Sequence, residues 1–211
     1  DWQDVIFRTA ASHNQNVSYS KSHDTGSYLA SVGFGNQLGV VENSNMERIS
    51  ARLNVNQRFL NDKLKITLQG TYSRINDQLA PIAGSAGFRG DVLGAAYSAN
   101  PTWPNSPSFD QTGGLLNPAN LLRYSSGRAN TNRYLANLSA EYDFSDELSG
   151  KVSVGIDQSD SDNYSVSSKN LNSTGSVTGN GRGSYNNLEV ENELLEATLN
   201  YNKTFGDSKI E

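Results

Sequence analysis

Residues 46–74 read MERISARLNVNQRFLNDKLKITLQGTYSR, and this stretch decides the fold. It divides into two segments of alternating polarity around the tight turn Leu60-Asn61-Asp62-Lys63. Side chains in a β-strand point to opposite faces at successive residues. The two segments therefore predict a hairpin with one apolar face and one strongly polar face. The apolar positions are Ile49, Ala51, Leu53, Val55, Leu64, Ile66, Leu68 and Tyr72.

The polar face of this hairpin is unusually rich in charge, because the first segment alone places three arginines on it. An apolar face opposite such a charged face is typical of a sheet that contacts lipid on one side and lines a water-filled lumen on the other. The same alternation recurs near residue 140. The residues that we expect to face the lumen are Arg48, Arg52, Asn54, Asn56, Arg58, Arg133 and Glu141.

Composition limits the classes of protein that the chain can belong to. Only 35% of residues are hydrophobic, and no segment approaches the roughly 18 consecutive apolar residues of a membrane-spanning helix. A transmembrane β-barrel remains possible, because only every second residue of its strands is apolar. The net charge is −5 and basic residues are scattered singly, so we expect no nucleic-acid partner. The absence of cysteine excludes a disulfide scaffold and thiolate metal sites.

Seven segments along the chain show strand-like alternation, which predicts an all-β fold. They are residues 14–22, 27–41, 46–60, 63–76, 131–144, 147–159 and 185–205. Tight polar turns at residues 23–26, 61–62, 145–146 and 206–208 alternate with longer connections at 39–45, 76–130 and 160–186. Short turns at one end of an antiparallel up-and-down meander and long loops at the other are typical of an outer-membrane barrel. A soluble sandwich has shorter strands and shorter loops.

Two details of these segments carry further expectations. In the last segment the apolar parity changes at Leu194-Leu195, which indicates either a β-bulge or an upper half that has left the membrane. Aromatic residues gather near the short turns, where an interfacial girdle would lie. These aromatics are Tyr28, Phe59, Tyr142, Phe144, Tyr201 and Phe205.

The connection 76–130 holds all five prolines, and we interpret it as a long extracellular loop. Loops on a rigid scaffold often carry function. Aromatic side chains in this loop would stack on sugar rings or contact a partner protein, and the alternative that they only pack the loop against itself remains equally open. The candidate substrate-binding residues are Tyr97, Trp103, Phe109, Arg123 and Tyr124.

Catalytic and metal-binding motifs find little support in the sequence. It contains no Gly-x-Ser-x-Gly elbow and no His-Glu-x-x-His pair, so we expect neither an enzyme nor a cofactor. Asp157, Asp160 and Asp162 offer oxygen ligands at calcium-like spacing. They lack the glycine and the closing glutamate of an EF-hand loop, so a solvated acidic strand end is the preferred interpretation.

Several short stretches resemble a known family when they are taken in order. They are DWQDVIFRTA at residues 1–10, HNQNVSYS at 13–20, YLASVGF at 28–34, GVV at 39–41, RISARLNVN at 48–56, and NPA at 117–119 before NRYLAN at 132–137. In this order the stretches are similar to the SusC/RagA family of TonB-dependent outer-membrane transporters. The resemblance covers nearly the whole chain.

The resemblance implies a large barrel of the 22-stranded type, plugged by an N-terminal domain. Residues 1–211 would then be an internal part of that barrel, with about seven of its strands, and we expect both ends to continue into a longer protein. The implied function is uptake of an oligosaccharide or peptide across the bacterial outer membrane. The implied partners are a SusD-like surface lipoprotein, the lipid bilayer, and the TonB complex, which would be engaged through the missing N-terminal region. The alternative is a secreted β-sandwich or β-solenoid that binds carbohydrate.

Overall fold

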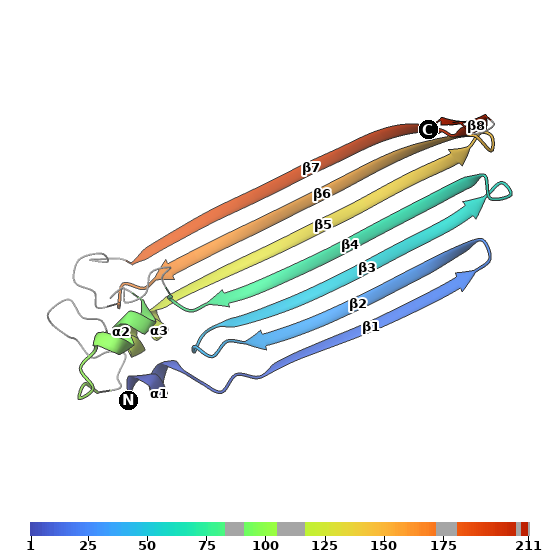
Figure 1. The fold of residues 1–211 in the computed structure, drawn as a ribbon. Helices are drawn as coiled ribbons and strands as arrows, with labels where there is room; N and C mark the ends of the chain where they lie inside the picture. Colours follow the sequence, from blue (N-terminus) through green and yellow to red (C-terminus); the bar gives the residue numbers. More distant parts are fainter. Residues whose placement is uncertain (83–90, 105–116, 172–180, 206–207, 211) are drawn as a thin grey trace.

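The computed structural model describes residues 1–82, 91–104, 117–171, 181–205 and 208–210. Seven long strands form one antiparallel sheet in which each strand pairs with the next along the chain (Figure 1). These strands are β1 Ser12–His23, β2 Gly26–Leu38, β3 Asn45–Phe59, β4 Leu64–Leu79, β5 Ser125–Asp143, β6 Leu148–Ser167 and β7 Arg182–Tyr201. A short hairpin follows, formed by β8 Lys203–Phe205 and β9 Ser208–Ile210. The predicted all-β meander is confirmed.

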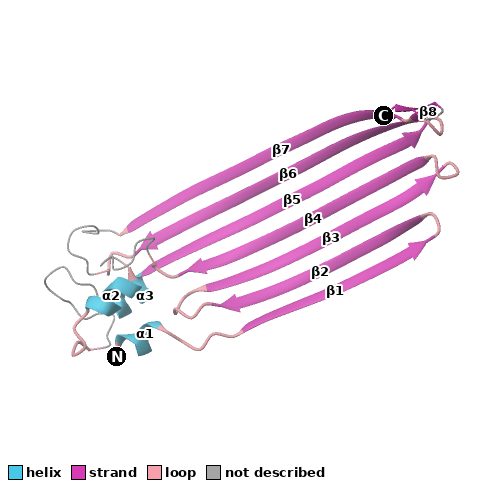
Figure 2. Ribbon diagram, in the orientation of Figure 1, coloured by secondary structure: helices cyan, strands magenta, loops and turns pink. Residues whose placement is uncertain are grey.

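The tight turns between strands lie together at one end of the sheet (Figure 2). Between β3 and β4, Leu60, Asn61 and Asp62 have φ angles of 56°, 54° and 68°. Asn and Asp tolerate this left-handed region better than other residues with a Cβ, so the local sequence favours the turn. The turn predicted at residues 60–63 is therefore confirmed.

The strands extend further at the opposite end than the sequence predicts. The connection between β4 and β5 covers residues 80–124 and not 76–130. Of the predicted connection 160–186, residues 160–167 belong to β6 and residues 182–186 belong to β7. Cross-strand pairs hold this polar extension together. The rings of Tyr164 and Tyr185 lie 4.9 Å apart, and Asn187 Nδ2 donates to Asp160 at 2.7 Å. Such pairs stabilise strands of low intrinsic β propensity.

The short helices of the described residues lie beside that end of the sheet and form what we call the helical cap (Figure 2). They are α1 Trp2–Ile6, α2 Val92–Ser98 and α3 Pro118–Tyr124. Each follows a residue whose side chain accepts a hydrogen bond from the first turn: Asp1, Asp91 and Asn117. Asp and Asn are favoured caps because they satisfy helix N–H groups that have no partner within the helix. Among the described residues, no helix is long and apolar enough to cross a bilayer.

In the described residues, the buried apolar side chains lie in the helical cap and in the connections that contact it, and not in the sheet. Trp2 is only 6% exposed, and its Nε1 donates to the carbonyl of Asn100 at 3.0 Å. Asn43 Nδ2 donates to the carbonyl of Leu122 at 2.7 Å and ties the β2–β3 connection to α3. The two apolar clusters contain Ile6, Val41 and Val92 in one, and Ala95, Leu121 and Leu171 in the other. In the described residues the seven-stranded sheet is a single layer, and the only other sheet is the β8–β9 hairpin, so the sandwich alternative is wrong.

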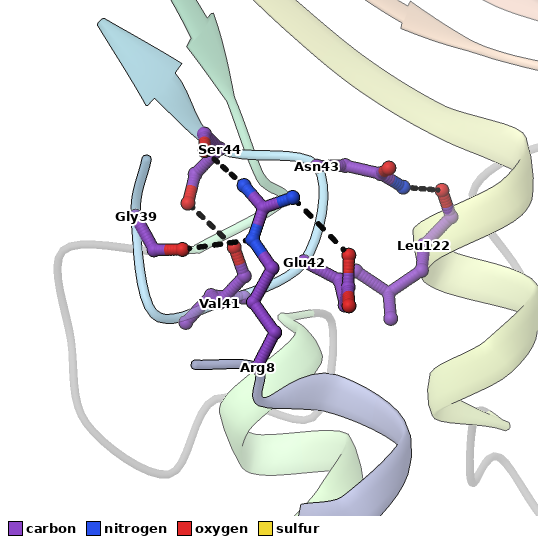
Figure 3. Close-up of polar contacts among 7 residues, drawn as sticks. All are labelled: Arg8, Gly39, Val41, Glu42, Asn43, Ser44 and Leu122. Carbon is purple, nitrogen blue, oxygen red and sulfur yellow. Dashed lines mark hydrogen bonds and ion pairs between the residues drawn. The ribbon is translucent and has the colours of Figure 1, made fainter. Parts of the chain in front are cut away.

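Arg8 joins the segment after α1 to the connection between β2 and β3 (Figure 3). Its guanidinium donates to the carbonyl of Gly39 at 3.0 Å and to the carbonyl of Ser44 at 2.6 Å. Its Nη1 lies 3.5 Å from Glu42 Oε2. The planar guanidinium has several donors in a fixed arrangement, so one side chain holds both ends of this tight connection.

Candidate functional site

Backbone pairing shows which side chains share a face of the sheet. Residues that pair directly across antiparallel strands point to the same side. Arg52 pairs with Thr71, and Thr71 pairs with Leu135. Even residues of β3 therefore share a face with odd residues of β4 and β5. This polar face carries all seven residues predicted to face the lumen: Arg48, Arg52, Asn54, Asn56, Arg58, Arg133 and Glu141.

Two ion pairs lie on the polar face. Arg133 binds the carboxylate of Asp157 with both ends of its fork, Nε to Oδ1 at 2.9 Å and Nη2 to Oδ2 at 2.8 Å. Lys65 Nζ lies 4.0 Å from Glu141 Oε2. Arg133 and Glu141, both expected to face the lumen, therefore have different partners. The partner of Arg133 is a carboxylate on β6.

A groove of about 660 Å³ crosses the polar face from β3 to β7. Amide side chains line much of it, namely Asn54, Gln69, Asn137 and Asn192. Arg52 and Asp157 bring charge to the groove, and Leu135 and Leu194 bring apolar surface. Each amide offers both donors and acceptors without net charge. The groove is therefore suited chemically to neutral solutes with many hydrogen-bonding groups.

Gly155 forms part of the floor of this groove. A Cβ at this position would lie 3.2 Å from Asn137 Nδ2, so a side chain here would displace the amide. Gly155, Gln69, Asn137 and Asn192 were not predicted as members of one site. Alternation on each strand placed Gln69 and Asn137 on polar faces, but only the strand register brings these residues together.

A smaller hollow of about 310 Å³ lies on the polar face over β1 to β3. Arg48 and Ser50 contribute to its lining. A Cβ at Gly33 would lie 2.9 Å from Ser50 Oγ, and one at Gly35 would lie 2.5 Å from Asn14 Oδ1. The two glycines thus permit close approach of polar side chains from both neighbouring strands.

The candidate residues of the long connection do not form one site in the described structure. Tyr97 on α2 is 93% exposed. Tyr124 packs against the buried cluster of the helical cap, which favours the packing role for this residue. The guanidinium of Arg123 lies 5.9 Å from the centre of the Tyr124 ring. Trp103 is partly buried after α2, and Phe109 lies outside the described residues.

The three calcium candidates are not brought together by the fold. Asp157 lies on the polar face, whereas Asp160 and Asp162 lie on the opposite face because residues 160–167 are strand and not loop. Asp162 Oδ1 accepts hydrogen bonds from Tyr185 Oη at 2.5 Å and from Asn187 Nδ2 at 3.1 Å. These bonds lower the pKa of Asp162, and the bond to Asp162 raises the pKa of Tyr185 to about 12. Asp157 therefore cannot share an ion with Asp160 and Asp162.

The predicted β-bulge near Leu194-Leu195 is wrong. Pairing between β6 and β7 runs without interruption from Leu148↔Tyr201 to Ser167↔Arg182. Apolar residues of β7 therefore lie on both faces. Leu195, Ala197, Leu199 and Tyr201 share the apolar face, whereas Leu188, Val190 and Leu194 lie on the polar face. The parity therefore changes without any irregularity of the backbone pairing.

The apolar side chains form a continuous band on the face opposite the polar one. This apolar band consists of every second residue, from the first to the last, within each of these ranges: 17–19 of β1, 28–34 of β2, 49–55 of β3, 64–72 of β4, 134–142 of β5, 148–156 of β6 and 195–201 of β7. Tyr28 and Tyr142, near the short turns, lie on this face as the girdle requires.

The apolar band crosses the hydrogen-bonded rows obliquely. At its edge nearer the helical cap, Ile49 pairs with the polar Arg74, Tyr134 with Gln158, and Ile156 with Glu193. From β3 to β7, this edge of the band therefore lies progressively closer to the short turns. A band parallel to a membrane has this appearance when the strands are tilted, and barrel strands tilt by about 35–45°.

Comparison with known proteins gives sequence relatives for nearly the whole chain. No family model matches the sequence. The chain is 28% identical over 172 residues to the TonB-dependent receptor SusC of Bacteroides thetaiotaomicron, a match that covers 68% of the chain and 16% of that receptor. It is 29% identical over 220 residues to the TonB-dependent receptor P3 of Formosa agariphila, with 98% of the chain and 21% of the receptor covered.

Solved structures share the fold. The RagAB peptide transporter superposes with a TM-score of 0.78 at 19% identity, over 98% of this chain and 24% of the other. The RagAB peptide importer in its open-open state gives a TM-score of 0.74 at 18% identity and the same coverage. The chain spans about a fifth of the length of the curated receptors that it matches.

Proposed function

We propose that this chain, a SusC/RagA-type TonB-dependent receptor segment in sequence and in fold, forms part of the wall of a barrel that imports nutrients across the bacterial outer membrane. In this proposal the apolar band contacts lipid and the polar face lines the water-filled lumen. The oblique course of the apolar band carries the proposal, because a lipid-facing band on tilted strands must cross the register rows in this way.

The orientation of the segment follows from the two ends of the sheet. Short turns lie on the periplasmic side of outer-membrane barrels and longer connections lie outside the cell. The helical cap, with the connection 80–124, would then lie at the cell surface. The remaining strands, the plug domain and the region that engages the TonB complex would belong to the rest of the receptor. This arrangement leaves residues 1–211 a wall-forming role and no enzymatic one.

The solute would be an oligosaccharide or a peptide. Asn54, Gln69 and Asn137 line the groove with groups that bind sugar hydroxyls and peptide amides equally well. A SusD-like lipoprotein would cover the outer end, where Tyr97 exposes almost its whole ring on α2. Exposed aromatic side chains are enriched where partner proteins bind.

Uptake by intact cells tests the proposal. Cells that carry the full receptor gene should take up labelled oligosaccharides or peptides, and deletion of the gene or collapse of the proton-motive force should abolish this uptake. Within the receptor, Gly155→Trp should fill the groove and slow uptake. Gly183→Trp places its side chain on the other face of the sheet, in β7, and should not slow uptake. Persistence of uptake of every labelled solute after gene deletion contradicts the proposal.

A further inference from the structure

A shallow, open hollow of about 650 Å³ extends over the apolar face from β1 to β5. Small residues of β2, β4 and β5 form part of its lining. Ala30 and Gly70 both pair with Leu53, and Gly70 also pairs with Ala136, so these positions lie in one register row. Leu53 lies in the same row, between Ala30 and Gly70. Other large side chains complete the lining: Val17, Tyr19, Val32, Tyr72 and Tyr134.

Nothing in β4 requires a glycine at position 70. A Cβ at this position would have no heavy atom within 4 Å, and the backbone φ of Gly70 is not positive. Glycine inside a strand weakens it, and often marks a site that another molecule approaches closely. The missing side chain therefore leaves space for something outside the sheet.

Two tyrosines bound the hollow on the side of the helical cap. The rings of Tyr72 and Tyr134 lie 4.9 Å apart, and Tyr72 Oη donates to Asn132 Oδ1 at 3.3 Å. Next in the register, Arg74 pairs with Asn132, so the face becomes polar directly beyond the tyrosines. Tyrosines with an apolar ring and a polar tip are enriched where a bilayer meets water.

We propose that the hollow binds one acyl chain of an outer-leaflet lipid, with the lipid headgroup beside Tyr72 and Tyr134. The proposal rests on the proposed function, since it needs the apolar band to face the bilayer. An apolar hollow that is left unfilled loses dispersion contacts along its lining. The hollow is continuous with the lipid-facing band, and its apolar lining and polar outer edge match a hydrocarbon chain that ends in a polar headgroup.

Photo-crosslinking in nanodiscs tests this inference on the full receptor. The probe is a phospholipid with a diazirine midway along one acyl chain, and mass spectrometry maps the adducts. We expect adducts at the row of Ala30, Gly70 and Ala136 to exceed those at Ile156 several-fold. Ile156 pairs with Ala136 on the next strand and lies outside the hollow, so it is a matched position.

Gly70→Leu provides the decisive variant. The open space at Gly70 lets the new side chain fit, so the receptor should still assemble, as heat-modifiable gel mobility would show. Adducts at Ala136 should fall several-fold, whereas Ala140→Leu, near the short turns on the same face, should leave them unchanged. Adducts that are distributed evenly along the apolar face and do not change with Gly70→Leu overturn the acyl-chain site but not the proposed function. Crosslinks to a second receptor at the hollow overturn it as well, and absence of adducts from the whole apolar band overturns both.

Discussion

Adjacent residues on β3 have opposite roles, and this is the smallest scale at which the fold can be understood. Arg52 lies on the polar face and lines both the groove and the smaller hollow there, whereas Leu53 lies on the apolar band. A shift of one residue in register would exchange the two faces along the whole strand. Strand register is therefore under strong constraint wherever one face meets lipid and the other meets water.

Charge on the apolar band should block assembly, and removal of charge from the polar face should not. On the proposed function, Leu53→Arg in the full receptor would place a cation against lipid, where it costs about 2–4 kcal/mol near the bilayer centre. Arg52→Leu changes a water-facing side chain and should be milder. Quantitative immunoblots of heat-modifiable receptor in outer membranes measure the difference. Equal tolerance of the two variants would contradict the assignment of the faces.

At the scale of elements, the sequence predicted the strands better than the helices. Apolar residues such as Ile66 and Leu68 alternate with polar ones over most of β4. A strand of this length is therefore still recognised when its predicted ends are wrong by a few residues. Helices α1, α2 and α3 have only five to seven residues each, too few for helical periodicity to appear. Their caps were readable, since Asn117 stands directly before Pro118, an order typical of a helix start.

The candidate site was predictable in part for the same reason. Side-chain alternation correctly placed Arg48, Arg133 and Glu141 on one face, because that requires only the strand period. The groove requires the register between strands, which sets Asn137 opposite Gly155. Register depends on the whole set of cross-strand contacts, and no single strand contains that information.

Arg8 should control the order of the β2–β3 connection. Arg8→Ala removes the guanidinium bonds to Gly39 and Ser44, so backbone amides of residues 39–44 should exchange hydrogen faster. Hydrogen exchange with mass spectrometry on the full receptor measures this change. Arg58→Ala, at the other end of β3, serves as the control. Unchanged exchange in residues 39–44 would remove the proposed role of Arg8.

At the scale of the whole molecule, the seven-stranded sheet has almost no core of its own. Large apolar side chains such as Val17 and Leu195 are 76% and 75% exposed, although they belong to the apolar band. Strands β1 and β7 are edges in the described sheet, and unpaired edges associate readily with other strands. Lipid, the adjoining barrel strands and the contents of the lumen would therefore supply the contacts that this sheet lacks.

The topology of the receptor should follow from the positions of the helical cap and the short turns. In a receptor made otherwise free of cysteine, Tyr97→Cys on α2 should react with an impermeant maleimide on whole cells. Asp62→Cys, in the turn between β3 and β4, should react only after the outer membrane is permeabilised. Gel-shift labelling of assembled receptor gives the readout. The reverse pattern would place the helical cap in the periplasm.

A nitroxide scan of residues 48–55 on β3 tests the central claim most directly, which is that the apolar band meets lipid and the polar face meets water. Each residue in turn is changed to a spin-labelled cysteine in the full receptor, reconstituted in bilayers. Electron paramagnetic resonance then measures accessibility to oxygen, which concentrates in lipid, and to a water-soluble nickel complex. We expect oxygen maxima at Ile49, Ala51, Leu53 and Val55, and nickel maxima at the residues between them. Accessibility without a two-residue period, or with the two faces exchanged, would contradict the account.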